Sequence, residues 1–172
     1  PMYQANEKYT LADRKPYQYD NSYSIIYQDA MSFGAKATIR GKFLDSFYID
    51  AFAKINTYSF DSLKAQERNL PLFTSALSAS YRILPQWNVG TSFYYVGERK
   101  DIKHSLPALT AEELTLDGFF DLNFSTDYTF LKRWTAFVDL SNVLGQSYQR
   151  WTSYPVQGFQ FLAGVKYRFN VK

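Results

Sequence analysis

Segments of about ten residues alternate apolar and polar side chains throughout this sequence, and the clearest of them is 47–57. Successive side chains of a β-strand point to opposite faces, so one face of this segment is apolar and the other is polar. The apolar face holds Phe47, Ile49, Ala51, Ala53 and Ile55, and the polar face holds Tyr48, Asp50, Lys54 and Asn56. A wall between lipid and a watery interior requires this contrast. The pattern predicts an all-β, antiparallel transmembrane β-barrel.

About eight strands are expected, all within a single domain. Residues 1–17 lack a clean period and are expected to be a lead-in or loop, and 18–172 are expected to supply the outer-membrane barrel strands. The expected strands are 19–28, 33–43, 47–57, 72–83, 87–97, 116–130, 134–140 and 157–169. Alternation is weakest in the first of these segments.

The connections between these strands alternate between short and long. Tight turns are expected near residues 45, 85 and 132, and long polar segments at 61–71, 98–115 and 143–156. Outer-membrane barrels have short periplasmic turns and long extracellular loops, so the two kinds of connection should lie at opposite ends of the strands. Aromatic residues make up 19% of the chain, about twice the ordinary share, which suits the two aromatic girdles of such a barrel. A soluble barrel or sandwich with its apolar face turned inward is the alternative.

Composition excludes several classes of function. The net charge of +3 is spread along the chain without the basic stripe of a nucleic-acid binder, so no nucleic-acid partner is expected. Cysteine is absent, which excludes disulfides and thiolate metal sites. No apolar run reaches the 18 residues of a transmembrane helix. The first residues lack a signal-peptide pattern, so the sequence is expected to represent a mature protein or a fragment of a longer one.

No catalytic residue, metal site or cofactor is expected. The single histidine, His104, lies beside Ser105 in a polar segment and outside any nucleophile motif. Glu112, Glu113, Asp117 and Asp121 lack the spacing of a calcium loop. Ligand contact is assigned instead to Arg150, Trp151 and Tyr154, because exposed aromatic rings stack on sugars or ring ligands and a guanidinium pairs with carboxylates. The alternative is that these three residues only cap the barrel rim.

The last third of the chain carries a more specific pattern. Phe120-Asp121-Leu122-Asn123 is followed by Val138-Asp139-Leu140-Ser141-Asn142-Val143-Leu144, then by Tyr148-Gln149-Arg150-Trp151, Tyr154-Pro155 and the final segment from Gly164 to Phe169. This order resembles the C-terminal barrel portion of TonB-dependent receptors. Pro71 and the step Tyr94-Tyr95-Val96-Gly97-Glu98-Arg99 are similar to versions found in Bacteroidetes. The resemblance extends more weakly back to about residue 20.

The final segment also resembles the signal by which the barrel-assembly machinery recognises its clients. Its elements here are Gly164, Tyr167 and Phe169. Two features depart from the pattern: Leu162 stands where a polar residue is preferred, and Asn170-Val171-Lys172 follow the terminal aromatic residue.

The resemblance implies a bacterial outer-membrane protein that takes up a scarce nutrient, such as an iron chelate or a glycan. The implied partners are outer-membrane lipid, the barrel-assembly machinery, TonB acting through a plug domain that these residues do not contain, and a surface lipoprotein or other envelope subunit. Receptors of this family have about 22 strands. The alternative is a small non-transporting barrel of about eight strands, whose interior side chains would fill, acting as a structural or interaction module in an envelope complex.

Overall fold

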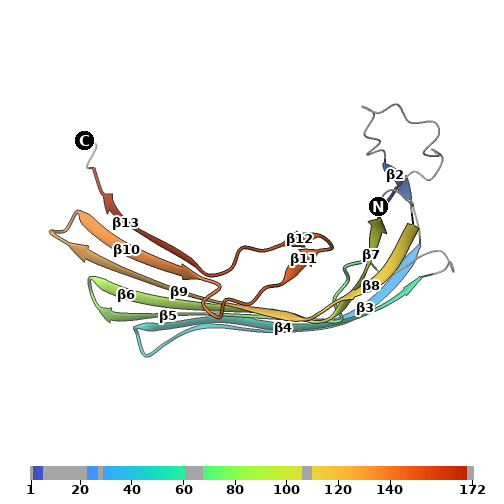
Figure 1. Ribbon diagram of the computed structural model, residues 1–172. Helices are drawn as coiled ribbons and strands as arrows, with labels where there is room; N and C mark the ends of the chain where they lie inside the picture. The colour runs from blue at the N-terminus through green and yellow to red at the C-terminus, as the bar shows by residue number, and fades with distance from the viewer. Residues whose placement is uncertain (1, 6–22, 27–28, 61–67, 106–109, 170–172) are drawn as a thin grey trace, which may run out of the picture.

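The computed structural model describes residues 2–5, 23–26, 29–60, 68–105 and 110–169. Within these ranges, seven strands form one antiparallel sheet in the order β13-β10-β9-β6-β5-β4-β3 (Figure 1). The strands are β3 (Ala30–Phe43), β4 (Phe47–Phe60), β5 (Phe73–Leu84), β6 (Trp87–Val96), β9 (Phe119–Phe130), β10 (Trp134–Ser141) and β13 (Gln160–Tyr167). The prediction of an all-β antiparallel structure is confirmed.

Three two-stranded pairs accompany the sheet. They are β1 (Met2–Ala5) with β2 (Tyr23–Ile26), β7 (Arg99–Ser105) with β8 (Thr110–Leu116), and β11 (Gln149–Trp151) with β12 (Tyr154–Pro155). Among the described residues, no helix is long and apolar enough to cross a membrane.

The register keeps apolar and polar side chains on separate faces of the sheet. Ala51 pairs with Leu77, Leu77 with Phe93 and Phe93 with Leu122, so an apolar row crosses four strands. The adjacent row, on the other face, holds Arg40, Asp50, Ser78, Ser92 and Asn123. The sheet is curved, and the β11–β12 hairpin lies over its concave side (Figure 1). Tyr148, which leads into that hairpin, bonds to Asp121 in the polar parity of β9, so the concave face is the polar one.

The apolar face is open to its surroundings rather than packed into a core. Phe33 is 69% exposed, and Ile39 and Phe161 are each 63% exposed. Among the described residues, the buried apolar side chains are Val96, Leu116, Phe119 and Tyr148, none of which belongs to the apolar rows of the sheet. An apolar convex face of this extent suits lipid and not water. The soluble barrel would need this face turned inward, so that alternative is wrong.

The sheet is open in the part of the chain that the structure describes, with β3 and β13 as its two edges. A closed eight-stranded barrel is therefore not formed by these residues. The expected strand 19–28 contributes only β2, which pairs with β1 instead of joining the sheet; residues 19–22 and 27–28 lie outside the described residues. Within the expected lead-in, residues 2–5 form β1.

Residues 98–115, expected to be a long polar connection between strands, contain most of the β7–β8 hairpin. Lys103 pairs with Glu112 in its register, and Ile102 pairs with Glu113. Opposite charges across a strand pair are favourable, and a hairpin that projects beyond a membrane has water on both sides. The apolar-to-polar contrast that marks a membrane strand is therefore not required there.

The short connections lie together at one end of the sheet, as predicted (Figure 1). The turn between β3 and β4 places Leu44 and Asp45 at φ of 50° and 52°, and the turn between β9 and β10 places Leu131 and Lys132 at 48° and 62°. Two successive positive φ values produce the twist that tight β-hairpins favour. The β7–β8 and β11–β12 hairpins belong to the opposite end.

Candidate ligand site beneath the β11–β12 hairpin

The candidate site lies where the β11–β12 hairpin approaches the concave face of the sheet. The hairpin turns at Ser153, whose φ is 68° and whose amide donates to Gln149 Oε1 at 2.8 Å. The amide of Val156 donates to the Tyr148 carbonyl at 3.0 Å and closes its base. A register shift between Gln149 and Trp151 marks a bulge, which redirects side chains locally.

Arg99, the first residue of β7, is the main anchor of this hairpin. Its side chain is 4% exposed. Nε donates to Asn69 Oδ1 at 2.6 Å and Nη1 to the Asp117 carbonyl at 3.2 Å. Nη2 donates to the carbonyls of Gln149 and Arg150 in the hairpin. One guanidinium therefore connects β11 to the segment that precedes β5 and to the connection between β8 and β9.

Asn69 and Asp101 complete the attachment. Asn69 Nδ2 donates to the Arg150 carbonyl at 3.0 Å, and the Asn69 amide donates to the Lys100 carbonyl at 2.6 Å. Asp101 Oδ2 accepts from the Thr152 amide at 3.0 Å and also from the Thr152 hydroxyl. The hairpin is thus held to β7 at two neighbouring points.

A buried cluster of Phe119, Tyr148 and Asp121 supports the same region from the sheet. The Arg99 guanidinium lies over the Phe119 ring, 5.1 Å from the ring centroid. The Tyr148 hydroxyl donates to Asp121 Oδ2 at 2.6 Å, while Asp121 Oδ1 is buried without a hydrogen-bond partner. Loss of the Tyr148 hydroxyl would remove the hydrogen bond to Oδ2 as well, so the stability of this cluster depends on that hydroxyl.

Burial changes the pKa of two groups in this network. It lowers the pKa of the Arg99 guanidinium from its ordinary value, against the opposing influence of Asp101 and Tyr94. It raises the pKa of the Tyr148 phenol, with the hydrogen bond to Asp121 and the charge of Asp121 acting in the same direction and Arg150 acting against them. Arg99 nevertheless keeps its charge at neutral pH.

Asn142 fixes the connection that leads from β10 towards the hairpin. Its side chain is 3% exposed. Its amide donates to Asn123 Oδ1 at 3.0 Å, and its Nδ2 donates to the carbonyls of Gln146 and Gln157 at 2.9 and 3.2 Å. Gly145 follows at φ 61°, a conformation that glycine adopts readily. The asparagine of the Leu-Ser-Asn motif is therefore a structural residue.

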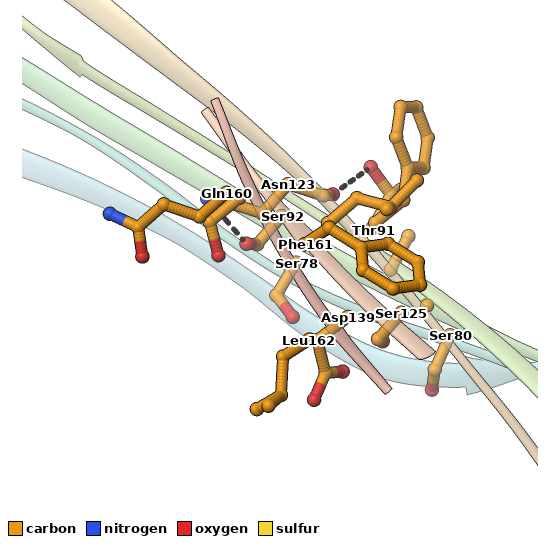
Figure 2. Close-up of a pocket in the computed structure, with 15 residues that line it drawn as sticks. Ser78, Ser80, Thr91, Ser92, Asn123, Ser125, Asp139, Gln160, Phe161 and Leu162 are labelled. Atoms are coloured by element: carbon orange, nitrogen blue, oxygen red, sulfur yellow. Dashed lines mark hydrogen bonds between the residues drawn. The ribbon is translucent and has the colours of Figure 1, made fainter. Parts of the chain in front are cut away.

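Two hollows open on the concave side. The first, of about 400 Å³, lies beside the hairpin and is lined by Asn69, Pro71, Tyr94, Val96, Arg99, Phe119, Arg150 and Trp151; we call it the hairpin pocket. The second, of about 710 Å³, lies lower on the sheet and includes Ser78, Ser80, Ser92, Ser125 and Asp139 (Figure 2). In the second hollow, Asn123 Nδ2 donates to Ser92 Oγ at 3.3 Å. Its polar lining consists mainly of hydroxyl and amide side chains, with Asp139 as the one charged residue among the described lining residues.

Of the three residues predicted to contact ligand, Arg150 and Trp151 both line the hairpin pocket. Trp151 is 60% exposed, so much of its ring surface is open to a ligand. Tyr154 pairs with Trp151 across the hairpin but is 71% exposed and does not line this pocket. Their role in binding remains a prediction.

The predicted assembly residues lie in and after β13. Gly164 faces the Phe137 ring on β10, and Tyr167 packs against Trp134 and Phe169 with ring centroids 4.7 Å apart in both pairs. The side chains of His104 and Ser105 lie outside the described residues. Among the described residues, no group of three or more histidine, cysteine or acidic side chains could hold a metal ion.

Arg99 and Asn69 were missed as site residues in the sequence. Arg99 stands in the Tyr-Tyr-Val-Gly-Glu-Arg step, which we used only for the family resemblance. Its buried position depends on carbonyls about fifty residues later in the chain. No local pattern reports that contact.

No family model matches the sequence. Solved structures do match it: the ferripyoverdine receptor of the outer membrane of Pseudomonas aeruginosa superposes with a TM-score of 0.71 at 16% identity, covering 96% of this chain and 23% of that chain. The chain has the fold of part of an outer-membrane β-barrel. The ferric-catecholate import receptor Fiu of E. coli K12 gives a TM-score of 0.68 at 15% identity, covering 87% of this chain and 22% of that chain.

A third match to the receptor-barrel fold is the siderophore receptor PiuA of Acinetobacter baumannii, with a TM-score of 0.66 at 16% identity, covering 81% of this chain and 22% of that chain. The present chain therefore spans between a fifth and a quarter of the length of the structures it resembles. These neighbours are receptors and not enzymes.

Proposed function

We propose that these residues form part of the barrel of a TonB-dependent receptor in a bacterial outer membrane. Such a receptor binds a scarce nutrient, an iron chelate or a glycan, at its extracellular end and takes it up with energy supplied through TonB. One observation carries the proposal: a hairpin at the long-connection end is anchored over the concave face by Arg99 and leaves a pocket bordered by Arg150 and Trp151. The siderophore receptors that share this fold support the same reading.

The proposed partners follow from this role. The apolar convex face contacts outer-membrane lipid, and TonB acts through a plug domain. We further propose that Gly164, Tyr167 and Phe169 are read by the barrel-assembly machinery, that a surface lipoprotein or other envelope subunit assists capture, and that the lineage is Bacteroidetes. The spacing of Gly164, Tyr167 and Phe169 supports the first of these points, and the likeness of Pro71 and of the step from Tyr94 to Arg99 to Bacteroidetes versions supports the last.

Uptake in whole cells tests the proposal. A strain that lacks the gene for the full-length protein would be complemented with wild type, Trp151→Ala or Leu144→Ala. Cells would then be supplied with ⁵⁵Fe as ferripyoverdine or as a ferric catecholate, or with a radiolabelled oligosaccharide, with and without TonB. Leu144 is an exposed residue that does not line the hairpin pocket, and it serves as the control.

We expect TonB-dependent accumulation of one probe with wild type and Leu144→Ala, and a reduced apparent affinity with Trp151→Ala. Correctly inserted wild-type protein that accumulates none of the probes, with or without TonB, contradicts transport of these classes. That outcome supports the alternative role as a non-transporting module.

A further inference from the structure

The hairpin pocket has an unusual balance of charge. Its lining includes two arginines, Arg99 and Arg150, and three aromatic residues, Tyr94, Phe119 and Trp151. Among the described residues that line it, there is neither an aspartate nor a glutamate. Asp101 and Asp121 are not among the lining residues: Asp101 accepts from the Thr152 amide and Asp121 accepts from the Tyr148 hydroxyl. Within its described lining, the pocket therefore offers two guanidinium groups and flat aromatic surfaces.

Arg99 illustrates this imbalance because every acceptor that it binds is uncharged. These acceptors are an asparagine amide oxygen and three backbone carbonyls. The charge of Asp101 partly offsets the cost of burying this cation, and a ligand anion in the adjoining space would offset it further. The positive charge is held in place by the fold and needs no rearrangement to meet a ligand.

Positive charge continues across the concave face next to the pocket. Lys54 on β4 is in register with Thr74, and Thr74 is in register with Val96, which lines the pocket. Lys36 lies directly opposite Lys54 on β3, and its ammonium sits 4.7 Å from the Phe52 ring centroid. Like charges directly opposite each other destabilise a strand pair unless something neutralises them. Two lysines therefore lie in the row of the sheet that ends at the pocket.

We propose that the hairpin pocket selects a ligand in which a carboxylate is carried on a flat aromatic body. The carboxylate pairs with the Arg150 guanidinium, which is suited to planar two-point recognition. The aromatic body stacks on Trp151 or Tyr94. A pocket of about 400 Å³ accommodates such a group as part of a larger ligand. This inference rests on the proposed binding role and specifies the chemistry of its ligand.

A matched pair of probes tests the proposal on the full-length protein in detergent. The probes are 6-fluoro-2-naphthoate and 6-fluoro-2-naphthamide, which share shape and differ in charge, and binding is followed by ¹⁹F NMR. The variants are Arg150→Gln, which removes the charge, Arg150→Lys, which retains it, and Arg168→Gln, which removes an arginine after β13 and outside the pocket lining. Protein-free micelles measure partition of the probes into detergent.

We expect the naphthoate to bind at least tenfold more tightly than the naphthamide to wild type and to Arg168→Gln. Arg150→Gln should abolish this preference and Arg150→Lys should keep part of it. Raising the salt concentration should weaken naphthoate binding alone. Equal binding of the two probes, binding no greater than partition into micelles, or an equal loss of both in Arg150→Gln would overturn the proposal.

Whole-cell uptake separates this inference from the proposed function. If cells take up a probe nutrient but the protein does not prefer the naphthoate, the proposed transport function stands and the aromatic-anion ligand is wrong. If the protein prefers the naphthoate but transports none of the probes, the anion site stands and the protein is a non-transporting module.

Discussion

The rings of Phe119 and Tyr148 stack face to face, with centroids 3.9 Å apart and planes inclined by 8°. Phe119 begins β9 and Tyr148 precedes β11, so this contact joins the sheet to the hairpin that borders the pocket. The Tyr148 hydroxyl extends the contact by donating to Asp121. Tyr148 thus positions the hairpin both by packing and by hydrogen bonding. Substitutions of Tyr148 should therefore alter the structure of the hairpin pocket.

Replacing Tyr148 by phenylalanine keeps the stacked ring and removes the hydroxyl. Asp121 Oδ2 would then lose the hydroxyl that donates to it, while Oδ1 already lacks a partner. An unsatisfied buried acceptor costs about 1–3 kcal/mol. We expect faster hydrogen exchange at the Val156 amide, which donates to the Tyr148 carbonyl. The exposed Tyr154→Phe serves as the control, and identical exchange in the two variants would contradict this role for the hydroxyl.

Alkaline pH should loosen the same hairpin. Burial and Asp121 raise the pKa of Tyr148 above its ordinary value of 10.0 in the folded protein. As pH rises from that value towards the higher folded pKa, the unfolded region loses its proton first, so the stability of the folded hairpin falls. Subtilisin should cleave wild type faster at pH 10.5 than at pH 8 after correction for enzyme activity on an unfolded substrate. Tyr148→Phe should not show this increase in cleavage between pH 8 and pH 10.5. If the variant shows the same increase as wild type, another titrating group causes it.

Charge on the two faces of the sheet should be tolerated very differently. Ala51→Arg or Leu122→Arg places a guanidinium on the apolar convex face, at an expected cost of about 2–4 kcal/mol near the bilayer midplane. Ser78→Arg lies in the polar row beside Asp50 and should be nearly neutral. Urea unfolding from lipid vesicles measures all three variants. Equal stability of the three would count against the assignment of the convex face to lipid.

Gly164→Ala should destabilise the β10–β13 pair. A Cβ at this position would lie 2.7 Å from the Phe137 ring, so the ring would have to move. Phe137→Leu in the same chain should restore stability by making room for the methyl group. If the unfolding midpoint of the double variant recovers while its insertion into the outer membrane stays defective, the assembly machinery recognises Gly164 itself. If both the midpoint and insertion recover, the glycine is needed for packing alone.

The strands within the sheet could be predicted because a membrane wall forces a period of two on the sequence. Residues 47–57 show this directly, and the structure extends the strand only to Phe60. The β7–β8 hairpin could not be predicted, since strands with water on both faces need no apolar row. The roles of Arg99 and Asn69 also escaped prediction, because their partners come from a hairpin far along the chain. Arg150 and Trp151, which line the hairpin pocket, could be chosen as candidates because an aromatic residue beside an arginine is informative on its own, and the binding role of these two residues and Tyr154 stays a prediction.

The two edges of the sheet define what assembly must achieve. β3 has 14 residues and β13 has 8, and every second residue on each edge directs its amide and carbonyl away from the strand beside it. Hydrocarbon offers these groups no hydrogen bonds, and each unsatisfied group there costs several kcal/mol. Insertion and edge pairing must therefore be coupled at both β3 and β13, along the part of each strand that lies in hydrocarbon.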